Sequence, residues 1–275
     1  MKLSTSSLIK QSPYQKIEIT RYKDDYSLFL NGEIQFHTSE EKQSHEWMVA
    51  VPMALSKKNE SVLILGGGDG FAAREAIKCG AKKITVVEFD PEMIELTKKN
   101  LIIRKLSKDS FNDSKVKVIN DDAIQYAIDS DEKFDIVIDD CEYNIGDQPS
   151  NLNKYIKYLQ KLPKLLNDGG IGCMMGLLDQ EPIYFEKFLE ELKLFNPEMV
   201  EGLNIYEKMI DRTAFILKNI FPNAKSQEFF SKEVGLELYT YFSNEPIEQQ
   251  HPLNAESISN IDSLIYSDLF NEYKI

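Results

Sequence analysis

ILGGGDGFAAREA, residues Ile64 to Ala76, places four glycines and an aspartate between an apolar run and a segment with helical spacing. A glycine turn between a buried strand and a helix is typical of doubly wound α/β proteins that bind a nucleotide. Gly66, Gly68 and Gly70 form G-x-G-x-G, whereas the dinucleotide fingerprint is G-x-G-x-x-G. No lysine follows these glycines, so the turn is not a nucleoside-triphosphate P-loop. The turn therefore predicts a nucleoside-containing ligand of another kind.

Strand and helix patterns alternate after this turn. Apolar strand-like runs occupy 61–68, 82–90, 115–121, 134–140, 169–176 and 235–246, and helical spacing occupies 70–80, 91–101, 122–129, 151–166, 180–195 and 203–221. Repeated strand–helix–strand units predict a parallel sheet with helices on both faces. We therefore expect an α/β fold with a Rossmann-like domain over residues 48–275.

The segment before this domain has a different pattern. Residues 14–22 alternate between apolar and polar side chains, and residues 26–36 read as two strands around Asn31-Gly32, a strong hairpin signal. Helical spacing follows over 39–55, with Ser39 at the N-cap and Trp47, Val51 and Leu55 on one face. We therefore expect a small N-terminal β-hairpin domain over residues 1–47.

Acidic side chains stand where the predicted strands end. Glu88 follows the turn by about twenty residues, at the position that bonds a ribose in nucleotide-binding folds, and Asp122 and Asp140 end two later strands. Since the carboxyl ends of parallel strands meet at one edge of a sheet, these carboxylates are expected to surround one ligand. Asp122 is also a candidate helix N-cap, and both roles can coexist.

Asp69 selects among nucleoside ligands. A carboxylate in the turn would repel a pyrophosphate, but it would attract a sulfonium and an ammonium group. S-adenosylmethionine and its decarboxylated form carry such cations, together with a ribose for Glu88 and an adenine amine for Asp122. The alternative is a turn aspartate that hydrogen-bonds its own backbone. Asp140 is then placed to hold an acceptor amine and take its proton.

The sequence resembles the polyamine aminopropyltransferases, the spermidine synthase family. The motifs LGGGDG, VVEFDPEMI, INDDA and FDIVIDD follow that family's order, and SPYQKIEITR, LFLNGEIQF and SEEKQSHEWMVAVPMAL resemble its N-terminal part. The resemblance covers most of residues 12 to 175. It implies decarboxylated S-adenosylmethionine as co-substrate, a di- or polyamine as acceptor, 5′-methylthioadenosine as product, and a homodimer or homotetramer.

The resemblance also implies roles for individual residues. Gln35 and His45 resemble the residues around the aminopropyl end of the donor, and Asp69 resembles the carboxylate that binds its amine. Glu88 resembles the ribose ligand, Asp122 the adenine contact, and Asp140 the catalytic aspartate. Gly66, Gly68 and Gly70 belong to the same cofactor-binding set.

Two departures from the family pattern affect the acceptor side. Ser44 stands where the family usually has a tyrosine, and Tyr143 and Asn144 stand where it usually has a second aspartate and a proline. Asp139, Glu142 and Tyr143 are candidate substrate-binding residues that could replace the lost groups. A methyltransferase, a transferase with an unusual acceptor, and a non-catalytic ligand-binding relative remain open alternatives.

The composition limits the partners. The chain has 275 residues and a formal net charge of −13, which argues against nucleic acid and anionic membranes as partners. Its three cysteines fit neither a disulfide framework nor a metal-ligand spacing, so we expect no metal and a cytoplasmic location. No apolar run is long enough to cross a bilayer, and the N-terminus lacks the apolar stretch of a signal peptide.

Overall fold

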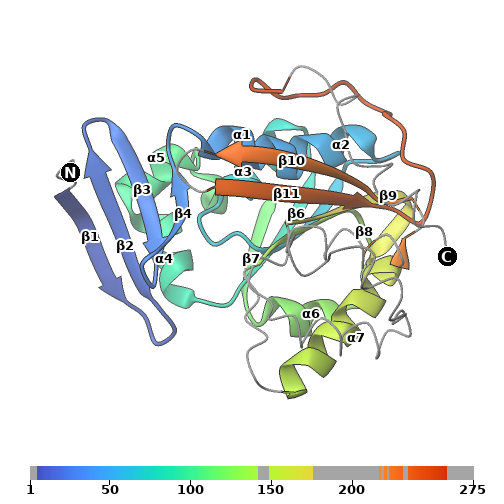
Figure 1. The fold of residues 1–275 in the computed structure, drawn as a ribbon, viewed down its shortest axis with the longest axis horizontal. Coiled ribbons are helices and arrows are strands. Elements are labelled where there is room, and N and C mark those ends of the chain that lie inside the picture. Colours follow the sequence, from blue (N-terminus) through green and yellow to red (C-terminus); the bar gives the residue numbers. More distant parts are fainter. Residues whose placement is uncertain are drawn as a thin grey trace, which may run out of the picture.

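The computed structural model describes residues 5–141, 149–175, 223–231 and 235–258, together with residues 217, 220 and 221. These residues build two sheets, a four-stranded one at the N-terminal end and a seven-stranded one covered by helices (Figure 1). The predicted helix at 180–195, most of the one at 203–221, and the chain after residue 258 lie outside the described residues. Within the described residues, no helix is long and apolar enough to span a membrane.

The N-terminal sheet is antiparallel in the order β1-β2-β3-β4, with strands β1 (Thr5–Gln11), β2 (Lys16–Tyr22), β3 (Asp25–Leu30) and β4 (Glu33–His37). The predicted turn at Asn31-Gly32 is confirmed, with φ values of 52° and 91° at these residues. Both values lie in the left-handed region that Asn and Gly tolerate best. The pairing of β1 with β2 was not predicted, because SSLIK lacks a clear alternation.

One face of this sheet packs against helices of the larger unit. Its apolar side chains form a core with residues of α3 (Phe71–Lys78), α4 (Pro91–Lys99) and α5 (Leu101–Leu106). We call this cluster the shared core: Ile17, Ile19, Leu28, Phe36, Phe71, Met93, Leu96 and Ile103. All eight are buried, so the N-terminal sheet and the helices are stabilised together.

The predicted helix over 39–55 is present but has three parts. These are α1 (Glu41–His45), a π-helical turn η1 (Glu46–Ala50) and α2 (Val51–Leu55). Trp47, Val51 and Leu55 are buried as expected. The prediction of Ser39 as N-cap was wrong: the cap position is Glu40, without a side-chain bond, and the Ser39 hydroxyl lies 2.7 Å from Nδ1 of His37 instead.

The seven-stranded sheet confirms the Rossmann-like fold. Strands β5 (Ser61–Gly66), β6 (Lys83–Glu88), β7 (Val116–Asn120), β8 (Phe134–Asp140) and β9 (Leu166–Met175) are parallel, in the order β9-β8-β5-β6-β7. The strand β11 (Gly235–Phe242) joins β9 antiparallel, and β10 (Lys225–Ser231) pairs with β11. The winding direction reverses between β5 and β8, where such sheets bind ligands.

Helices cover both faces of this sheet. On one face α3 packs with α1, η1 and α2, while α6 (Ala123–Asp129) and α7 (Pro149–Leu165) pack on the other (Figure 1). Predicted start and stop signals are confirmed at α3 and α4: Gly80 follows α3 with φ 96°, and Pro91 opens α4. The short helices α5 and η2 (Ser110–Asn112) were not predicted, since their residues show no clear periodicity.

After β11 the chain runs back beside the helical segments η1, α2 and α3. The amides of Gln250 and His251 donate to the carbonyl of Ala54, each at 2.9 Å. Further on, the fully buried carboxylate of Glu46 accepts bonds from the amides of Glu256 and Ser257, at 2.8 and 2.7 Å. The returning segment therefore supplies hydrogen bonds that this buried charge requires.

Candidate ligand-binding site

A cavity of about 290 Å³ opens at the carboxyl ends of β5, β6 and β8, beside the N-terminal sheet. Its lining includes four carboxylates, those of Asp69, Glu88, Asp90 and Asp140, and the backbone of the glycine turn. The remaining lining residues are Tyr14, Gln15, Leu28, Leu30, Gln35, Val87, Phe89, Met93, Ala123, Cys141 and Met175. The cavity combines apolar walls with concentrated negative charge, which suits a cationic ligand with an apolar part.

The glycine turn packs directly against the acidic residues. A Cβ atom at Gly66 would lie 2.2 Å from the backbone oxygen of Asp140, and one at Gly68 would lie 2.6 Å from Oε2 of Glu88. Gly67, which the sequence analysis did not single out, has φ 69°, and its Cβ would lie 3.1 Å from Oδ2 of Asp140. The absence of side chains at these positions therefore leaves room for Glu88 and Asp140 beside the turn.

Gly70 serves the turn rather than the cavity wall. It has φ 80° at the N-cap of α3, and a Cβ there would lie 2.6 Å from Oγ of Ser110. It is not among the described residues that line the cavity. Direct cofactor contact by Gly70 stays a prediction.

Asp69 combines both roles considered for it. Its Oδ1 accepts a bond of 2.9 Å from the amide of Phe71, as a turn aspartate does, and the residue also lines the cavity. Burial raises the pKa of the Asp69 carboxyl, and the charge of Glu41 acts in the same direction, whereas His45 and Arg74 oppose them. A bound cation would favour the ionised form of Asp69.

Glu88 stands at the end of β6 and faces the turn. Its Oε1 accepts a bond of 2.8 Å from the amide of Asp90. Burial raises the pKa of Glu88 to about 7, and the charges of Asp90 and Asp69 contribute. A carboxyl group in a cleft whose pKa is raised by burial and by neighbouring charges is a candidate functional residue.

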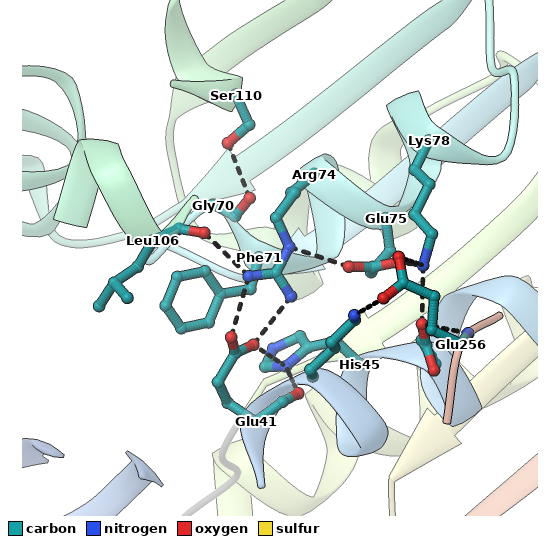
Figure 2. A network of polar contacts seen from close by, with 12 residues as sticks. Glu41, His45, Gly70, Phe71, Arg74, Glu75, Lys78, Leu106, Ser110 and Glu256 are labelled. Carbon is teal, nitrogen blue, oxygen red and sulfur yellow. Dashed lines mark hydrogen bonds and ion pairs between the residues drawn. The ribbon is translucent and has the colours of Figure 1, made fainter. Parts of the chain in front are cut away.

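His45 lies behind Asp69 rather than in the cavity lining. The side chain is buried, its Nδ1 lies 2.6 Å from the carbonyl oxygen of Glu41, and its ring meets Phe71 edge to face at 5.3 Å. Figure 2 shows His45 within a polar network between α1 and α3. The structure therefore places His45 where its charge acts on Asp69, and direct donor contact by His45 stays a prediction.

The centre of this network is Arg74, which the sequence analysis missed. Its guanidinium bonds both carboxylate oxygens of Glu41, at 3.0 and 2.8 Å, and its Nε bonds Glu75 at 2.9 Å (Figure 2). Arg74 also donates to the carbonyl of Leu106 at 2.9 Å. This side chain links the middle of α3 to α1 and to the end of α5, and no sequence motif indicates such a three-way contact.

Asp122 caps α6, as its alternative role predicted. Its Oδ1 accepts a 3.0 Å bond from the amide of Gln125, and its Oδ2 is paired with Lys154 of α7. Ala123, the next residue, lines the cavity, whereas Asp122 is not among the described lining residues. The adenine contact assigned to Asp122 therefore stays a prediction.

Asp140 and Asp139 point to opposite faces of the sheet. Asp140 lines the cavity, while Asp139 is buried toward α7, where its Oδ2 accepts a 2.5 Å bond from the hydroxyl of Tyr158. Asp139 is not among the described residues that line the cavity, because alternate residues of a strand face opposite sides. Substrate contact by Asp139 therefore stays a prediction. Glu142 and Tyr143, the other substrate candidates, lie outside the described residues.

Gln35, a predicted site residue, lines the cavity together with several residues that were not predicted. Gln15 bonds Asp90 through its amide nitrogen at 2.8 Å, and the rings of Tyr14 and Phe89 lie 4.2 Å apart. Phe89 and Asp90 directly follow the predicted site residue Glu88, and this position in the sequence could have indicated that they line the cavity. Tyr14 and Gln15 reach the cavity through tertiary packing alone.

Ser44 occupies the helix α1 position where a tyrosine was expected from the family pattern. Its hydroxyl lies 2.5 Å from the hydroxyl of Tyr239 in β11. Tyr239 pairs in register with Met175, which lines the cavity. A phenol from another part of the chain therefore lies beside Ser44.

Comparison with known proteins gives the family. The model of the spermine/spermidine synthase domain matches residues 41–194, more than half of the chain. The chain belongs to this family. The matched region contains the glycine turn and all four cavity carboxylates.

Named relatives agree with this membership. Polyamine aminopropyltransferase 2 of Aquifex aeolicus is 43% identical over 164 residues, which cover 59% of this chain and 33% of that protein. The polyamine aminopropyltransferase of Thermoplasma volcanium is 33% identical over 172 residues, 62% of this chain and 61% of that protein. The chain thus aligns with about a third of the length of the Aquifex relative.

Solved structures support the fold. A spermidine synthase in complex with the transition state analogue AdoDATO superimposes with a TM-score of 0.74 at 21% identity, covering 97% of this chain and 87% of that one. The spermidine synthase from Thermotoga maritima gives a TM-score of 0.69 at 21% identity, covering 94% and 82%. At this identity the likeness concerns the fold.

Proposed function

We propose that the protein is an aminopropyltransferase that moves the aminopropyl group of decarboxylated S-adenosylmethionine to a di- or polyamine and releases 5′-methylthioadenosine. The observation that carries this proposal is the grouping of Asp69, Glu88 and Asp140 around one glycine turn in one cavity. A sulfonium donor and an amine acceptor are both cations, and this cavity supplies several carboxylates for them. Membership of the spermine/spermidine synthase family supports the same reaction.

The residues divide the work by position. Glu88 accepts hydrogen bonds from the ribose, and Asp69 faces the ammonium end of the donor. Asp140, at the end of the neighbouring strand β8, holds the acceptor amine and takes its proton as the nitrogen attacks the carbon next to sulfur. The sulfonium is already a good leaving group, so the protein chiefly needs to align nitrogen, carbon and sulfur.

Product analysis tests the proposal. Purified protein is incubated with decarboxylated S-adenosylmethionine and a panel of diamines and polyamines, and methylthioadenosine and the alkylated amine are measured by mass spectrometry. We expect one methylthioadenosine per amine alkylated, and a loss of at least a hundredfold in rate for Asp140→Asn. Donor binding without turnover on any amine would reject the proposal and favour a ligand-binding relative.

Calorimetry separates this reaction from methyl transfer. A methyltransferase binds S-adenosylmethionine, whose carboxylate would meet Asp69, while the decarboxylated donor lacks that charge. We expect the decarboxylated donor to bind at least tenfold more tightly. Tighter binding of the carboxylated form would favour the methyltransferase alternative.

Cellular location and assembly complete the proposal. Within the described part of the chain, Cys79, Cys141 and Cys173 form no disulfide, which is compatible with the cytoplasm. The family resemblance favours a dimer or tetramer, and light scattering after size-exclusion chromatography measures the assembly directly. A monomer at all concentrations would reject this part.

A further inference from the structure

A buried cluster lies directly behind Asp140. Asp139 is 1% exposed, and its Oδ2 accepts the 2.5 Å bond from the hydroxyl of Tyr158, which is fully buried on α7. The other carboxylate oxygen of Asp139 accepts a 3.3 Å bond from the amide of Cys141. Asp140 stands between these two residues, so the carboxylate of Asp139 closes a turn around Asp140.

A carboxylate with so little water contact needs hydrogen-bond donors. Tyr158 remains a donor, because burial and the neighbouring Asp139 raise the pKa of its phenol well above the usual value of 10. Hydrogen bonds to an ionised group are stronger than bonds between neutral groups. The phenol of Tyr158 therefore anchors the end of β8 from the face opposite the cavity.

The cavity side restrains the same strand end. Gly66 is the register partner of Asp140 in β5, and the turn at Gly66 and Gly67 packs against the backbone and carboxylate of Asp140. Asp140 is thus held between the glycine turn on one face and the Asp139–Tyr158 pair on the other. Loss of either contact would leave the direction of its carboxylate less defined.

We propose that Tyr158 is a positioning residue, which acts through Asp139 to fix the backbone at Asp140 and so aims the catalytic carboxylate into the cavity. This inference rests on the proposed function, because it assigns a purpose to the precise direction of Asp140. Displacement of a reacting group by about 1 Å can cost a hundredfold in rate. Donor binding uses Asp69 and Glu88 on other elements and does not depend on this anchor.

The test compares two tyrosines of the same helix. Tyr158→Phe removes the anchor hydroxyl, and Tyr155→Phe is the matched control, since Tyr155 is equally buried and its hydroxyl faces the sulfur of Met174 at 3.8 Å. We expect kcat to fall at least tenfold in Tyr158→Phe, with the KM for the donor within twofold of wild type. In Tyr155→Phe, kcat and KM should stay within twofold.

A second readout needs no turnover. Hydrogen exchange of the Cys141 amide, followed by nuclear magnetic resonance, reports the bond to Asp139 directly. We expect exchange at least tenfold faster in Tyr158→Phe than in wild type or Tyr155→Phe.

The outcomes separate the two proposals. A wild-type protein that forms no methylthioadenosine would overturn the proposed function, and the positioning role with it, whereas the exchange experiment would still decide whether the anchor exists. An active wild type whose Tyr158→Phe variant keeps its kcat would overturn the positioning role and leave the proposed function intact. Equal Cys141 exchange in all three proteins would overturn the anchor itself.

Discussion

Replacement of Glu88 by glutamine should change how the stability of the unliganded protein depends on pH. Burial raises the pKa of Glu88 from 4.5 to about 7 in the folded chain. The folded state therefore binds more protons than the unfolded state between these values, and stability is lost as pH rises through this window. For one group with this shift, linkage gives a loss of about 2.5 kcal/mol in the free energy of unfolding between pH 5 and pH 8.

Glu88→Gln removes this loss, because glutamine stays neutral while its side-chain oxygen can still accept the bond from the Asp90 amide. The difference in unfolding free energy between variant and wild type should grow by about 2.5 kcal/mol, in favour of the variant, from pH 5 to pH 8. Urea denaturation at several pH values measures it. Parallel curves for wild type and Glu88→Gln would refute the reasoning.

Three further predictions concern the turn, the network and the helix cap. Gly68→Ala should weaken donor binding at least tenfold in calorimetry, because the new Cβ would lie 2.6 Å from Oε2 of Glu88; unchanged affinity would contradict the close packing. Arg74→Met should lower the unfolding free energy by about 3–5 kcal/mol, since it leaves the carboxylate of Glu41 buried without its bidentate partner; a loss in urea denaturation below about 1 kcal/mol would contradict a paired role. Asp122→Ala should lower the unfolding free energy by about 1 kcal/mol through the lost cap, while Asp122→Asn should keep most of the stability that the cap provides, as measured by thermal unfolding. Equal losses in both variants would assign the effect to the Lys154 ion pair instead.

The order of elements in the larger sheet could be predicted because its signals are local. Continuous apolar runs marked β5, β6 and β8 as strands buried on both faces, and Gly80 and Pro91 marked helix boundaries. The carboxyl ends of these strands then predicted where Asp69, Glu88 and Asp140 would meet. All three line one cavity.

The rest depends on tertiary contacts that leave no local pattern. The hydrogen bond between Gln15 and Asp90 joins residues 75 positions apart, and two partners of Arg74, Glu41 and Leu106, come from other helices. For Asp139 the strand alternation was sufficient to predict that its side chain faces away from Asp140. The alternation did not predict that Tyr158 would bond Asp139, because α7 contacts β8 through the packing of the whole sheet.

The shared core has a consequence for chimeric proteins. The buried face of the N-terminal sheet packs against Phe71. Phe71 is the first residue of α3 and lies two residues after Asp69. A graft that exchanged residues 1–47 with the same region of a relative would replace one side of this packing and leave the other unchanged. Mismatched volumes there would move the start of α3, and with it the carboxylate of Asp69. Donor specificity in such chimeras would therefore follow the fit of buried apolar side chains such as Ile17, Ile19 and Phe36, which are not among the described residues that line the cavity.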